Sequence, residues 1–290
     1  MYKHILKRPL YSIAGKISSL MRNFQKRQDD KLKQVANKQW NNLFNGKDFF
    51  EYNLYDYAKI NLYKDSVLSR LIWNNFEKDE TDYMCKVLKK GDVFVDIGSN
   101  IGLFSLIASK IVGNEGKVIC FEPSPLTYTR LKENVTINNY NNLDVRNLGL
   151  SDSIGELAFY VSNNGYDAWN SFSPSADNKL ELSIKVPVST LDFELSDIDK
   201  SKIKLVKIDV EGWEKFVLQG AKDFLINFNP IVMVEFTEQN TFNSGYPVHE
   251  IYDIMNSYGY TWYRLQKGEL VLEEKKLYYP YDNLVAIKNI

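Results

Sequence analysis

Charged residues near the ends of two apolar runs are the strongest candidates for chemistry in this chain. In the stretch "KIDVEG", Lys207, Asp209 and Glu211 alternate, so in an extended strand they share one face. The run "IVMVEF" carries a further carboxylate, Glu235, near its end. Charges inside a buried strand are costly unless they are paired or functional. We therefore expect these four side chains to form a catalytic cluster.

A cluster of this kind can remove the proton of a hydroxyl group, because a positioned carboxylate or histidine acts as a general base. Asp209 is the first candidate for the base, Glu211 the second and His249, at the start of a predicted helix, the third. Lys207 is expected to orient Asp209 or the hydroxyl of the acceptor. Glu211 can instead cap the helix that follows it, and His249 can be merely structural. In a rival mechanism Asp209, Glu211 or Glu235 holds a divalent cation that binds two substrate hydroxyls, and the sequence does not decide between the base and the metal.

The stretch "VFVDIGSNIGLFSL" looks like a nucleotide-binding loop that lacks one glycine. An apolar strand ends in Asp96, Gly98 permits a tight turn, and Gly102 permits close helix–strand packing. Asn100 replaces the glycine that touches a pyrophosphate in dinucleotide sites, although it tolerates a left-handed backbone. Glu122, twenty residues after Gly102, stands where a carboxylate accepts both ribose hydroxyls. The pattern predicts a site for adenosine without phosphates, and S-adenosylmethionine is the ligand of this kind.

Two further segments extend the predicted site. Asp152, in "LGLSD", can accept the adenine amino group or can simply form a turn. The polar segment 161–178 interrupts the regular pattern of strands and helices and holds Tyr166 and Trp169. Its Asn and Ser side chains could bind sugar hydroxyls while an aromatic ring stacks on a sugar face. We expect this segment to shape the acceptor pocket, with a plain surface loop as the alternative.

The elements that must position these residues form a regular α/β pattern from residue 81 onward. Seven apolar strands are predicted, most of them separated by helices, which indicates βαβ units and a parallel sheet. The expected fold class is α/β, a doubly wound Rossmann-like sheet in which the last strand pairs antiparallel. The predicted strands lie within residues 93–97, 116–122, 142–150, 203–210, 230–236, 260–266 and 283–288.

The first eighty residues differ from the rest of the chain. Residues 1–34 are interpreted as a basic helical extension, because residues 1–33 hold nine Lys or Arg and two Asp, a net charge of +7. Within it, apolar residues recur at helical spacing over residues 10–24, which indicates a helix that packs on protein or lies on an anionic membrane surface. Residues 35–80 are expected to form a mainly helical, aromatic-rich cap, and residues 81–290 the catalytic domain.

The composition bounds the class of protein. A hydrophobic fraction of 44% and a net charge of −1 are ordinary for a globular protein and give no reason to expect nucleic acid as a partner. No apolar run approaches the length of a membrane span, and the N-terminus lacks the apolar core of a signal peptide. Cys85 and Cys120, the two cysteines, are expected to be buried thiols. The sequence thus predicts a cytoplasmic protein, with contact to a membrane surface through residues 10–24 left open.

Residues 93–287 resemble the FkbM-type methyltransferases in four segments: "FVDIGSNIGLFSL", "VICFEPSP", "NLGLSDSIGELAFY" and "KLVKIDVEGWEKFVLQGA". The resemblance implies S-adenosylmethionine as cofactor and O-methylation, often of sugar hydroxyls in glycans or glycosylated metabolites. Two alternatives are kept. One is a nicotinamide-dependent oxidoreductase on the same fold, which Asn100 disfavours. The other is a non-catalytic module that retains the adenosyl pocket.

Overall fold

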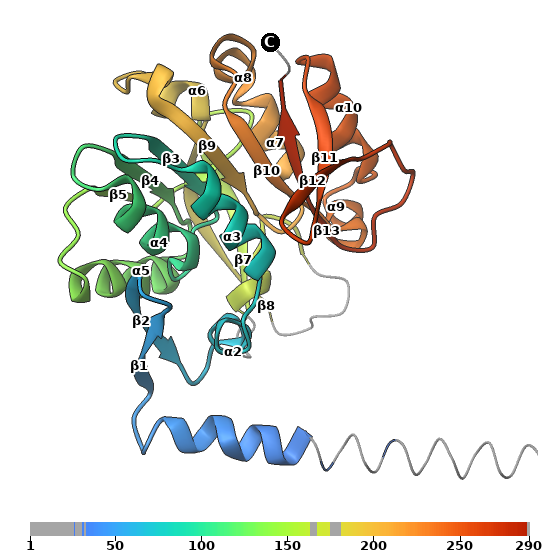
Figure 1. Ribbon diagram of the computed structural model, residues 1–290. Helices are drawn as coiled ribbons and strands as arrows, with labels where there is room; N and C mark the ends of the chain where they lie inside the picture. The colour runs from blue at the N-terminus through green and yellow to red at the C-terminus, as the bar shows by residue number, and fades with distance from the viewer. Residues whose placement is uncertain (1–25, 27–30, 32, 163–166, 175–180, 289–290) are drawn as a thin grey trace, which may run out of the picture. The chain divides into compact units, whose positions relative to one another are not determined.

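A large β-sheet forms the centre of residues 51–290 in the computed structural model (Figure 1). The structure describes residues 26, 31, 33–162, 167–174 and 181–288. In spatial order the strands are β12 (Glu269–Leu272), β11 (Thr261–Gln266), β13 (Asp282–Ile287), β10 (Ile231–Phe236), β9 (Ile203–Ile208), β3 (Val93–Ile97), β4 (Lys117–Phe121) and β5 (Leu143–Arg146). The strands from β10 to β5 run parallel, whereas β13, β11 and β12 pair antiparallel. All seven predicted strands are present, and β12 is an eighth that was not predicted.

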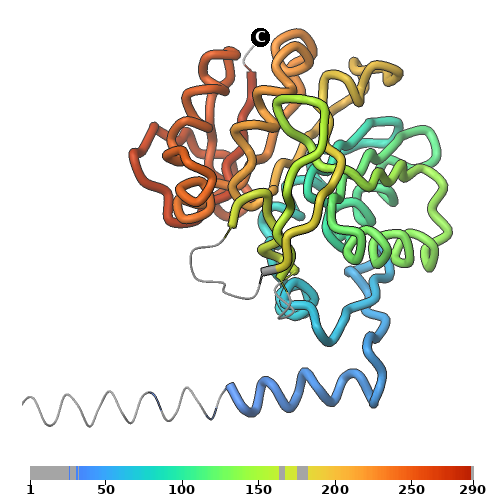
Figure 2. Tube along the Cα trace, turned by 180° about the vertical axis from the view of Figure 1, so that it is seen from behind, coloured from blue at the N-terminus to red at the C-terminus, as the bar shows by residue number. Residues whose placement is uncertain are grey.

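Helices cover both faces of this sheet (Figures 1 and 2), which confirms the doubly wound fold class. One face carries α3 (Lys78–Val87), α4 (Leu103–Val112) and α5 (Pro125–Ile137). The other carries α6 (Leu191–Glu194), α7 (Glu214–Gln219), α8 (Lys222–Phe228) and α10 (His249–Ser257). The chain order of the strands reverses between β3 and β9, and in such sheets ligands bind at this point, beyond the carboxyl ends of the strands.

Local sequence explains why the elements next to this point form. All five residues of β3 are buried, and four of them are apolar, as expected for a strand covered on both faces. Helix α4 is buried nearly all round, which accounts for its mainly apolar sequence. Helix α5 begins after Ser124, whose hydroxyl accepts from the backbone N–H of Thr127, and Pro125 occupies the first turn.

Residues 49–63 correct one expectation. The segment 35–80 was predicted to be mainly helical, but it contains the strands β1 (Phe49–Leu54) and β2 (Ala58–Tyr63), followed by the short helix α2 (Val67–Trp73). Residues in β1 alternate between more exposed and more buried positions, the two-residue period of a strand. The sequence predicts a helix for these aromatic residues, whereas in the structure they follow the two-residue period of a strand.

Residues 1–50 form a separate compact unit. Among its described residues, 33–43 are helical, and Trp40 and Phe44 pack edge to face with ring centroids 4.9 Å apart. The predicted amphipathic helix of residues 10–24 lies outside the described residues, so both its helical form and its contact with a membrane stay predictions.

A second, three-stranded sheet stands beside the ligand-binding edge of the main sheet. It is formed in spatial order by β6 (Gly149–Leu150), β8 (Glu181–Ser189) and β7 (Gly155–Ser162). The predicted strand 142–150 is in fact divided between β5 of the main sheet and β6 of this one. Phe159 and Phe172 pack edge to face at 4.9 Å, and Phe172 lies 5.4 Å from the ring of Trp213. This aromatic cluster fastens the segment 167–174 to the main domain.

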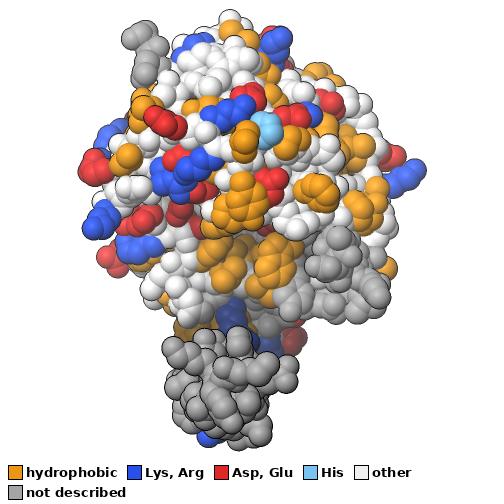
Figure 3. Space-filling view, turned by 90° about the vertical axis from the view of Figure 1, so that its right-hand side faces the viewer, with side chains coloured by type: hydrophobic (Ala, Val, Ile, Leu, Met, Phe, Trp, Pro, Cys, Tyr) orange, Lys and Arg blue, Asp and Glu red, His pale blue; other side chains and the backbone are white. Residues whose placement is uncertain are grey.

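The described residues can be compared with the expectations for membrane spans and for the cysteines, and they show how charge is distributed on one face. None of their helices combines the length and the apolar character needed to cross a membrane. Cys85 is partly buried and Cys120 fully buried, and both are free thiols. On the face formed by β11 to β13 and α10, basic and acidic side chains are interspersed with hydrophobic ones (Figure 3).

Candidate active site

The loop after β3 has the backbone conformation that its sequence predicts. Gly98 and Asn100 both adopt left-handed conformations, with φ of 83° and 46°. A Cβ atom on Gly98 would lie 1.9 Å from the carbonyl oxygen of Asp209, so only glycine fits there. The side-chain oxygen of Asn100 accepts from the N–H of Ile101, which stabilises the turn. Gly102 has φ of 99° and precedes α4, where it contacts Leu131 of α5 rather than a strand.

Glu122 follows β4 and is held against this loop. Its Oε2 accepts from the N–H of Asn100 and its Oε1 from the N–H of Ser124, each at 2.9 Å. Burial raises the pKa of this carboxyl group to about 7, although both hydrogen bonds oppose the shift. Because a carboxylate oxygen can accept a second hydrogen bond, both oxygens remain able to receive ribose hydroxyls.

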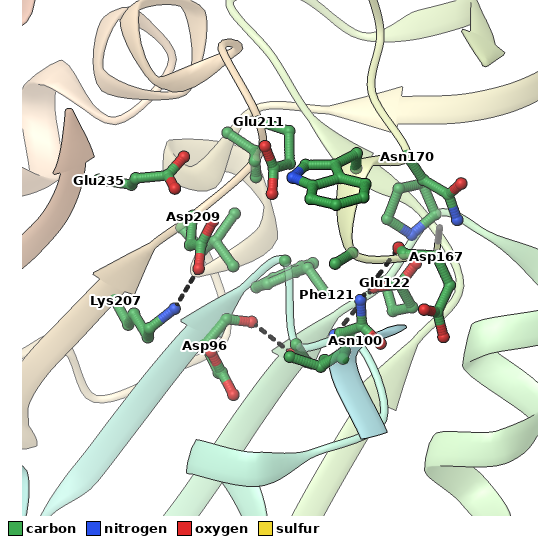
Figure 4. A pocket seen from close by; sticks show the side chains of 18 of the residues that line it. Asp96, Asn100, Phe121, Glu122, Asp167, Asn170, Lys207, Asp209, Glu211 and Glu235 are labelled. Carbon is green, nitrogen blue, oxygen red and sulfur yellow. Dashed lines mark hydrogen bonds and ion pairs between the residues drawn. The ribbon is translucent and has the colours of Figure 1, made fainter. Parts of the chain in front are cut away.

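These residues line a cavity of about 250 Å³ at the carboxyl edge of the sheet. Figure 4 shows Glu122 and Asp167 toward one end and Asp209 and Glu235 toward the other. Apolar side chains form much of the wall, which suits the faces of an adenine ring. They are Leu68, Leu71, Phe76, Ile97, Leu103, Phe104, Phe121, Leu148, Leu150, Phe159 and Phe172.

The charged residues of the cavity are almost all acidic. Lys207 is its one basic residue among those described, and the acidic residues are Glu77, Asp96, Glu122, Asp167, Asp209, Glu211 and Glu235. Such a cavity disfavours a pyrophosphate and favours a cationic ligand. A sulfonium group and an amino group are both cations, so the residues present fit S-adenosylmethionine better than a dinucleotide.

Asp96 is fully buried at the end of β3. It pairs in register with Lys207 of the neighbouring strand β9, so both side chains are on the same side of the sheet. The hydroxyl of Ser105 donates to its carboxylate. Burial raises the pKa of Asp96 to about 6, while the charge of Lys207 opposes the shift. The carboxylate of Asp96 would thus stand near the amino acid part of a bound cofactor.

Lys207 and Asp209 form the predicted pair. The ammonium group of Lys207 donates to Asp209 at 2.6 Å, lies 3.9 Å from Glu77, and sits 4.6 Å from the ring centre of Phe104. Burial alone would lower the pKa of Lys207, but the carboxylates of Asp209, Glu77 and Asp96 raise it above its usual range. Lys207 therefore stays charged and can orient Asp209, as expected.

Glu211 and Glu235 complete the predicted cluster. Glu211 has a left-handed backbone with φ of 54°, and its carboxylate accepts from the side-chain amide of Asn240 at 2.5 Å. Glu235 lies in β10, one residue beyond the register pair of Val234 with Ile208, and so beside Asp209. Burial first, and the neighbouring carboxylates second, raise the pKa values of Glu211 and Glu235 well above the usual range.

No described side chain caps the start of α7, so Glu211 does not have the capping role considered for it. The carboxylate of Glu214 accepts from the N–H groups of Val210 and Gly212, at 3.0 and 3.1 Å. Gly212 has φ of 98°, and a Cβ there would lie 2.4 Å from the carbonyl oxygen of Asn240. Glu214 thus stabilises the loop that contains Val210 and Gly212, and the carboxylate of Glu211 lines the cavity.

Two predicted site residues lie elsewhere. Asp152 is exposed and does not line the cavity; its carboxylate accepts from the hydroxyls of Ser151 and Ser153. It is the turn residue of the alternative interpretation, and the suggested adenine contact is wrong. His249 begins α10 and is also absent from the cavity wall, so it is not placed to act as the base.

The segment expected to shape the acceptor pocket does line the cavity where it is described. Asp167, Trp169 and Asn170 all contribute to the wall. Backbone hydrogen bonds in both directions join Tyr160 to Ser171. Residues 163–166 and 175–180 are outside the described residues, so Tyr166 stays a prediction.

A second, more polar cavity of about 210 Å³ adjoins the first. Its walls are Trp169, Ser171, Ser173, Glu211, Gln239, Asn240 and Asn243. Trp169 and Glu211 line both cavities, so they mark where the two meet. Amide and hydroxyl groups form most of the remaining wall. Helix α9 (Glu238–Asn243) supplies the amides, and the sequence analysis did not single it out.

The sequence analysis did not single out Glu77 and Tyr281, two further residues of the main cavity, and it included Asp167 only as part of the segment 161–178. Glu77, with a left-handed φ of 50°, is buried, and burial raises its pKa to about 7. Tyr281 donates to Glu77 at 3.4 Å, and Asn283 donates to it at 3.0 Å. Asp167 lies near Arg130, at 3.8 Å. No strand-end motif marks any of them in the sequence.

An open α/β sheet with an acidic, partly apolar cavity at its reversal point is the arrangement expected of the Rossmann-like methyltransferases. Residues 96–261 match the sequence model of the methyltransferase FkbM domain, and the chain belongs to this family. The predicted family, its enzyme class and its cofactor, S-adenosylmethionine, are thereby confirmed, and the oxidoreductase alternative is overturned. Residues 16–174 also match the model of the protein-L-isoaspartate(D-aspartate) O-methyltransferases.

Individual relatives share part of the chain. The hexuronic acid methyltransferase AglP of Haloferax volcanii is 30% identical over 159 residues, which are 54% of this chain and 61% of AglP. The 2-O-methyltransferase NoeI of Sinorhizobium fredii is 27% identical over 206 residues, which are 66% of this chain and 83% of NoeI. The solved structure of methyltransferase FkbM from Methylobacillus flagellatus is 16% identical, covers 71% of this chain and 47% of its own, and superposes with a TM-score of 0.42.

Proposed function

We propose that this protein transfers the methyl group of S-adenosylmethionine to a hydroxyl group of a sugar, in a glycan or a glycosylated metabolite. The observation that carries the proposal is the junction of two unlike cavities at Trp169 and Glu211. One cavity has largely apolar walls and the carboxylate of Glu122, and the other has amide and hydroxyl walls. A donor and a polyhydroxylated acceptor can therefore meet at the carboxylate cluster.

The second cavity has the chemistry that recognises a sugar. Amide groups of Gln239, Asn240 and Asn243 and hydroxyls of Ser171 and Ser173 can hydrogen-bond to sugar hydroxyls. Trp169 is 51% exposed and offers an aromatic surface at the same place. The names of two relatives agree with this acceptor class, because AglP is a hexuronic acid methyltransferase and NoeI is a 2-O-methyltransferase.

The roles of the residues follow from their positions. Glu122 would accept the ribose hydroxyls, and the loop with Gly98 and Asn100 would pass beneath the cofactor. Asp209, oriented by Lys207 at 2.6 Å, would take the hydroxyl proton as the acceptor oxygen attacks the methyl carbon. Bound S-adenosylmethionine would supply the methyl group, and the electron pair of the carbon–sulfur bond would stay on sulfur as the new carbon–oxygen bond forms. Alignment of donor and acceptor in the adjoining cavities would supply much of the rate enhancement.

The test is methyl transfer from isotopically labelled S-adenosylmethionine to a panel of hexuronic acids, nucleotide sugars and oligosaccharides. We expect a labelled methyl ether on at least one sugar and no transfer when the acceptor is omitted. Binding of S-adenosylmethionine without transfer to any hydroxylated acceptor would favour the non-catalytic module instead.

A variant of the second cavity tests where the acceptor binds. Asn243→Ala removes an amide from that cavity without touching the cofactor cavity, so the acceptor KM should rise about tenfold. The affinity for S-adenosylhomocysteine should stay unchanged. Asn227→Ala, on the exposed surface of α8, is the matched control and should change neither quantity. An unchanged acceptor KM in Asn243→Ala would place the acceptor elsewhere.

A further inference from the structure

Three carboxylates from two neighbouring strand ends converge at the junction of the two cavities. Asp209 and Glu211 follow β9, and Glu235 lies in β10. Each can offer an oxygen atom such that the three atoms lie within 4.8 Å of one another. Figure 4 shows the side chains of Glu211 and Glu235 turned toward the space above Asp209. Three oxygen donors at this spacing can contact one small cation.

The environment of Glu235 independently indicates that this cluster binds a ligand. Its side chain is only 6% exposed, and its Oε2 is buried without a hydrogen-bond partner among the described residues. By contrast, the buried carboxylates of Glu122 and Glu214 each accept from two backbone N–H groups. A buried polar atom without a partner is costly, so an unpaired carboxylate oxygen that faces two others calls for a bound cation.

The surrounding charges do not neutralise the cluster. Lys207 forms ion pairs with Asp209 and with Glu77, so its single positive charge is already shared by two carboxylates. Within the described part of the chain, neither Glu211 nor Glu235 makes an ion pair with a basic residue. Oxygen-only donors of negative charge suit hard divalent cations such as Mg²⁺ and Mn²⁺.

We propose that Asp209, Glu211 and Glu235 bind one divalent cation, Mg²⁺ or Mn²⁺. Three protein donors leave open positions in an octahedral shell, and Glu211 also lines the polar cavity. The open positions therefore face the acceptor, and two neighbouring hydroxyls of a sugar can fill them. This last step rests on the proposed function, whereas the cation site itself does not.

A bound cation would assist methyl transfer in two ways. It fixes the two oxygens of the acceptor, and it makes the coordinated hydroxyl more acidic, which eases the loss of its proton. With Asp209 holding the cation, the proton would pass to the remaining carboxylate oxygen of Glu211 or Glu235 or to water, and the new bond would still form between the hydroxyl oxygen and the methyl carbon. An acceptor without the hydroxyl next to the methylated one should therefore react more slowly.

Binding of Mn²⁺ to the full-length protein tests the site without any acceptor. The protein is first treated with a chelator and dialysed, and the loss of the free Mn²⁺ signal in electron paramagnetic resonance is then followed on titration. We expect one Mn²⁺ per chain, and an affinity at least tenfold weaker in Glu235→Gln and in Glu211→Gln. Asp152→Asn, an exposed carboxylate outside both cavities, is the matched control and should bind as the unaltered protein does.

The variants must remain folded for this result to count. Glutamine keeps the shape of the side chain, and a circular dichroism spectrum and melting temperature close to those of the unaltered protein would show that Glu211→Gln and Glu235→Gln are folded. The proposal is overturned if the unaltered protein binds no Mn²⁺, or if it binds Mn²⁺ equally well after both substitutions.

The two proposals fail in different ways. Methyl transfer to a sugar that persists in excess chelator would overturn the role of the cation in methyl transfer and leave the proposed function standing. Binding of one Mn²⁺ that both variants weaken, together with no transfer to any sugar, would keep the cation site and overturn the acceptor class.

Discussion

The raised pKa of Glu122 leads to a quantitative prediction about cofactor binding. The carboxylate must be ionised to accept two ribose hydroxyls fully, and burial raises its pKa to about 7. Below that pH most of the free protein carries a proton on Glu122. Binding should therefore weaken as the pH falls.

The size of the effect follows from the ionised fraction. With a pKa of about 7, about nine-tenths of Glu122 is ionised at pH 8 and about one-tenth at pH 6. The apparent affinity scales with the competent fraction, so binding should weaken about tenfold between these pH values. Glu122→Gln removes the charge, and with it charge-assisted hydrogen bonds worth roughly 1.5–3 kcal/mol each at pH 8.

The ligand for this assay should be 5′-methylthioadenosine, followed by calorimetry at several pH values. It keeps the ribose but lacks the amino acid part, so neither its own amino group nor Asp96, whose pKa is about 6, should dominate the pH dependence. We expect the pH dependence to disappear in Glu122→Gln and to persist in Asp152→Asn. Equal affinity of the unaltered protein at pH 6 and pH 8 would refute the role of Glu122.

Two further substitutions test the framework of the site. Gly98→Ala places a methyl group 1.9 Å from the carbonyl oxygen of Asp209. The free energy of unfolding, measured by thermal unfolding, should therefore fall by about 2 kcal/mol or more, and cofactor binding should be lost. Gly155→Ala meets no atom within 4 Å and should be neutral; equal stability of the two variants would contradict the close approach. Phe172→Ala removes a buried ring packed on Trp213 and should lower the free energy of unfolding by about 3 kcal/mol or more. A melting temperature within about a degree of the unaltered protein's would show that the aromatic cluster does not stabilise the fold.

The sequence could predict the residues at strand ends, and there is a physical reason for this. Parallel strands that are covered on both faces of a sheet appear in the sequence as apolar runs. Their carboxyl ends lie at the same edge of the sheet. Once the strands are assigned, they therefore place three acidic residues at the same edge of the sheet: Asp96, Glu122 and Asp209. Strand alternation placed Lys207 and Asp209 on one face, and the structure shows that Lys207 donates to Asp209.

Residues brought to the site by tertiary packing could not be predicted in this way. Glu77 precedes α3 in a left-handed conformation, and Asp167 lies in an irregular segment that the small sheet positions. No spacing in the sequence links either residue to the strands of the main sheet. The hairpin of β1 and β2 was missed for a related reason, because short aromatic-rich segments fit a helix and a strand almost equally well.

The roles of Glu211 and Glu214 could not be predicted from helix-capping preferences alone. Both stand near the start of α7, and charge near a helix start favours either as a cap. The left-handed backbone at Glu211 and Gly212 turns the first carboxylate outward and brings the N–H groups of Val210 and Gly212 to the second. Backbone conformation, which the sequence did not reveal, decides the assignment.

The two cavities are built from different stretches of the chain, and this separation bears on how new specificities could arise. The wall nearest Glu122 comes from β3, β4 and the residues after them, whereas the amides of the polar cavity come from α9. Exchange of α9 between homologous chains should thus alter the choice of acceptor and leave the donor side untouched. Glu211 belongs to both sides and is the position such redesign would have to preserve.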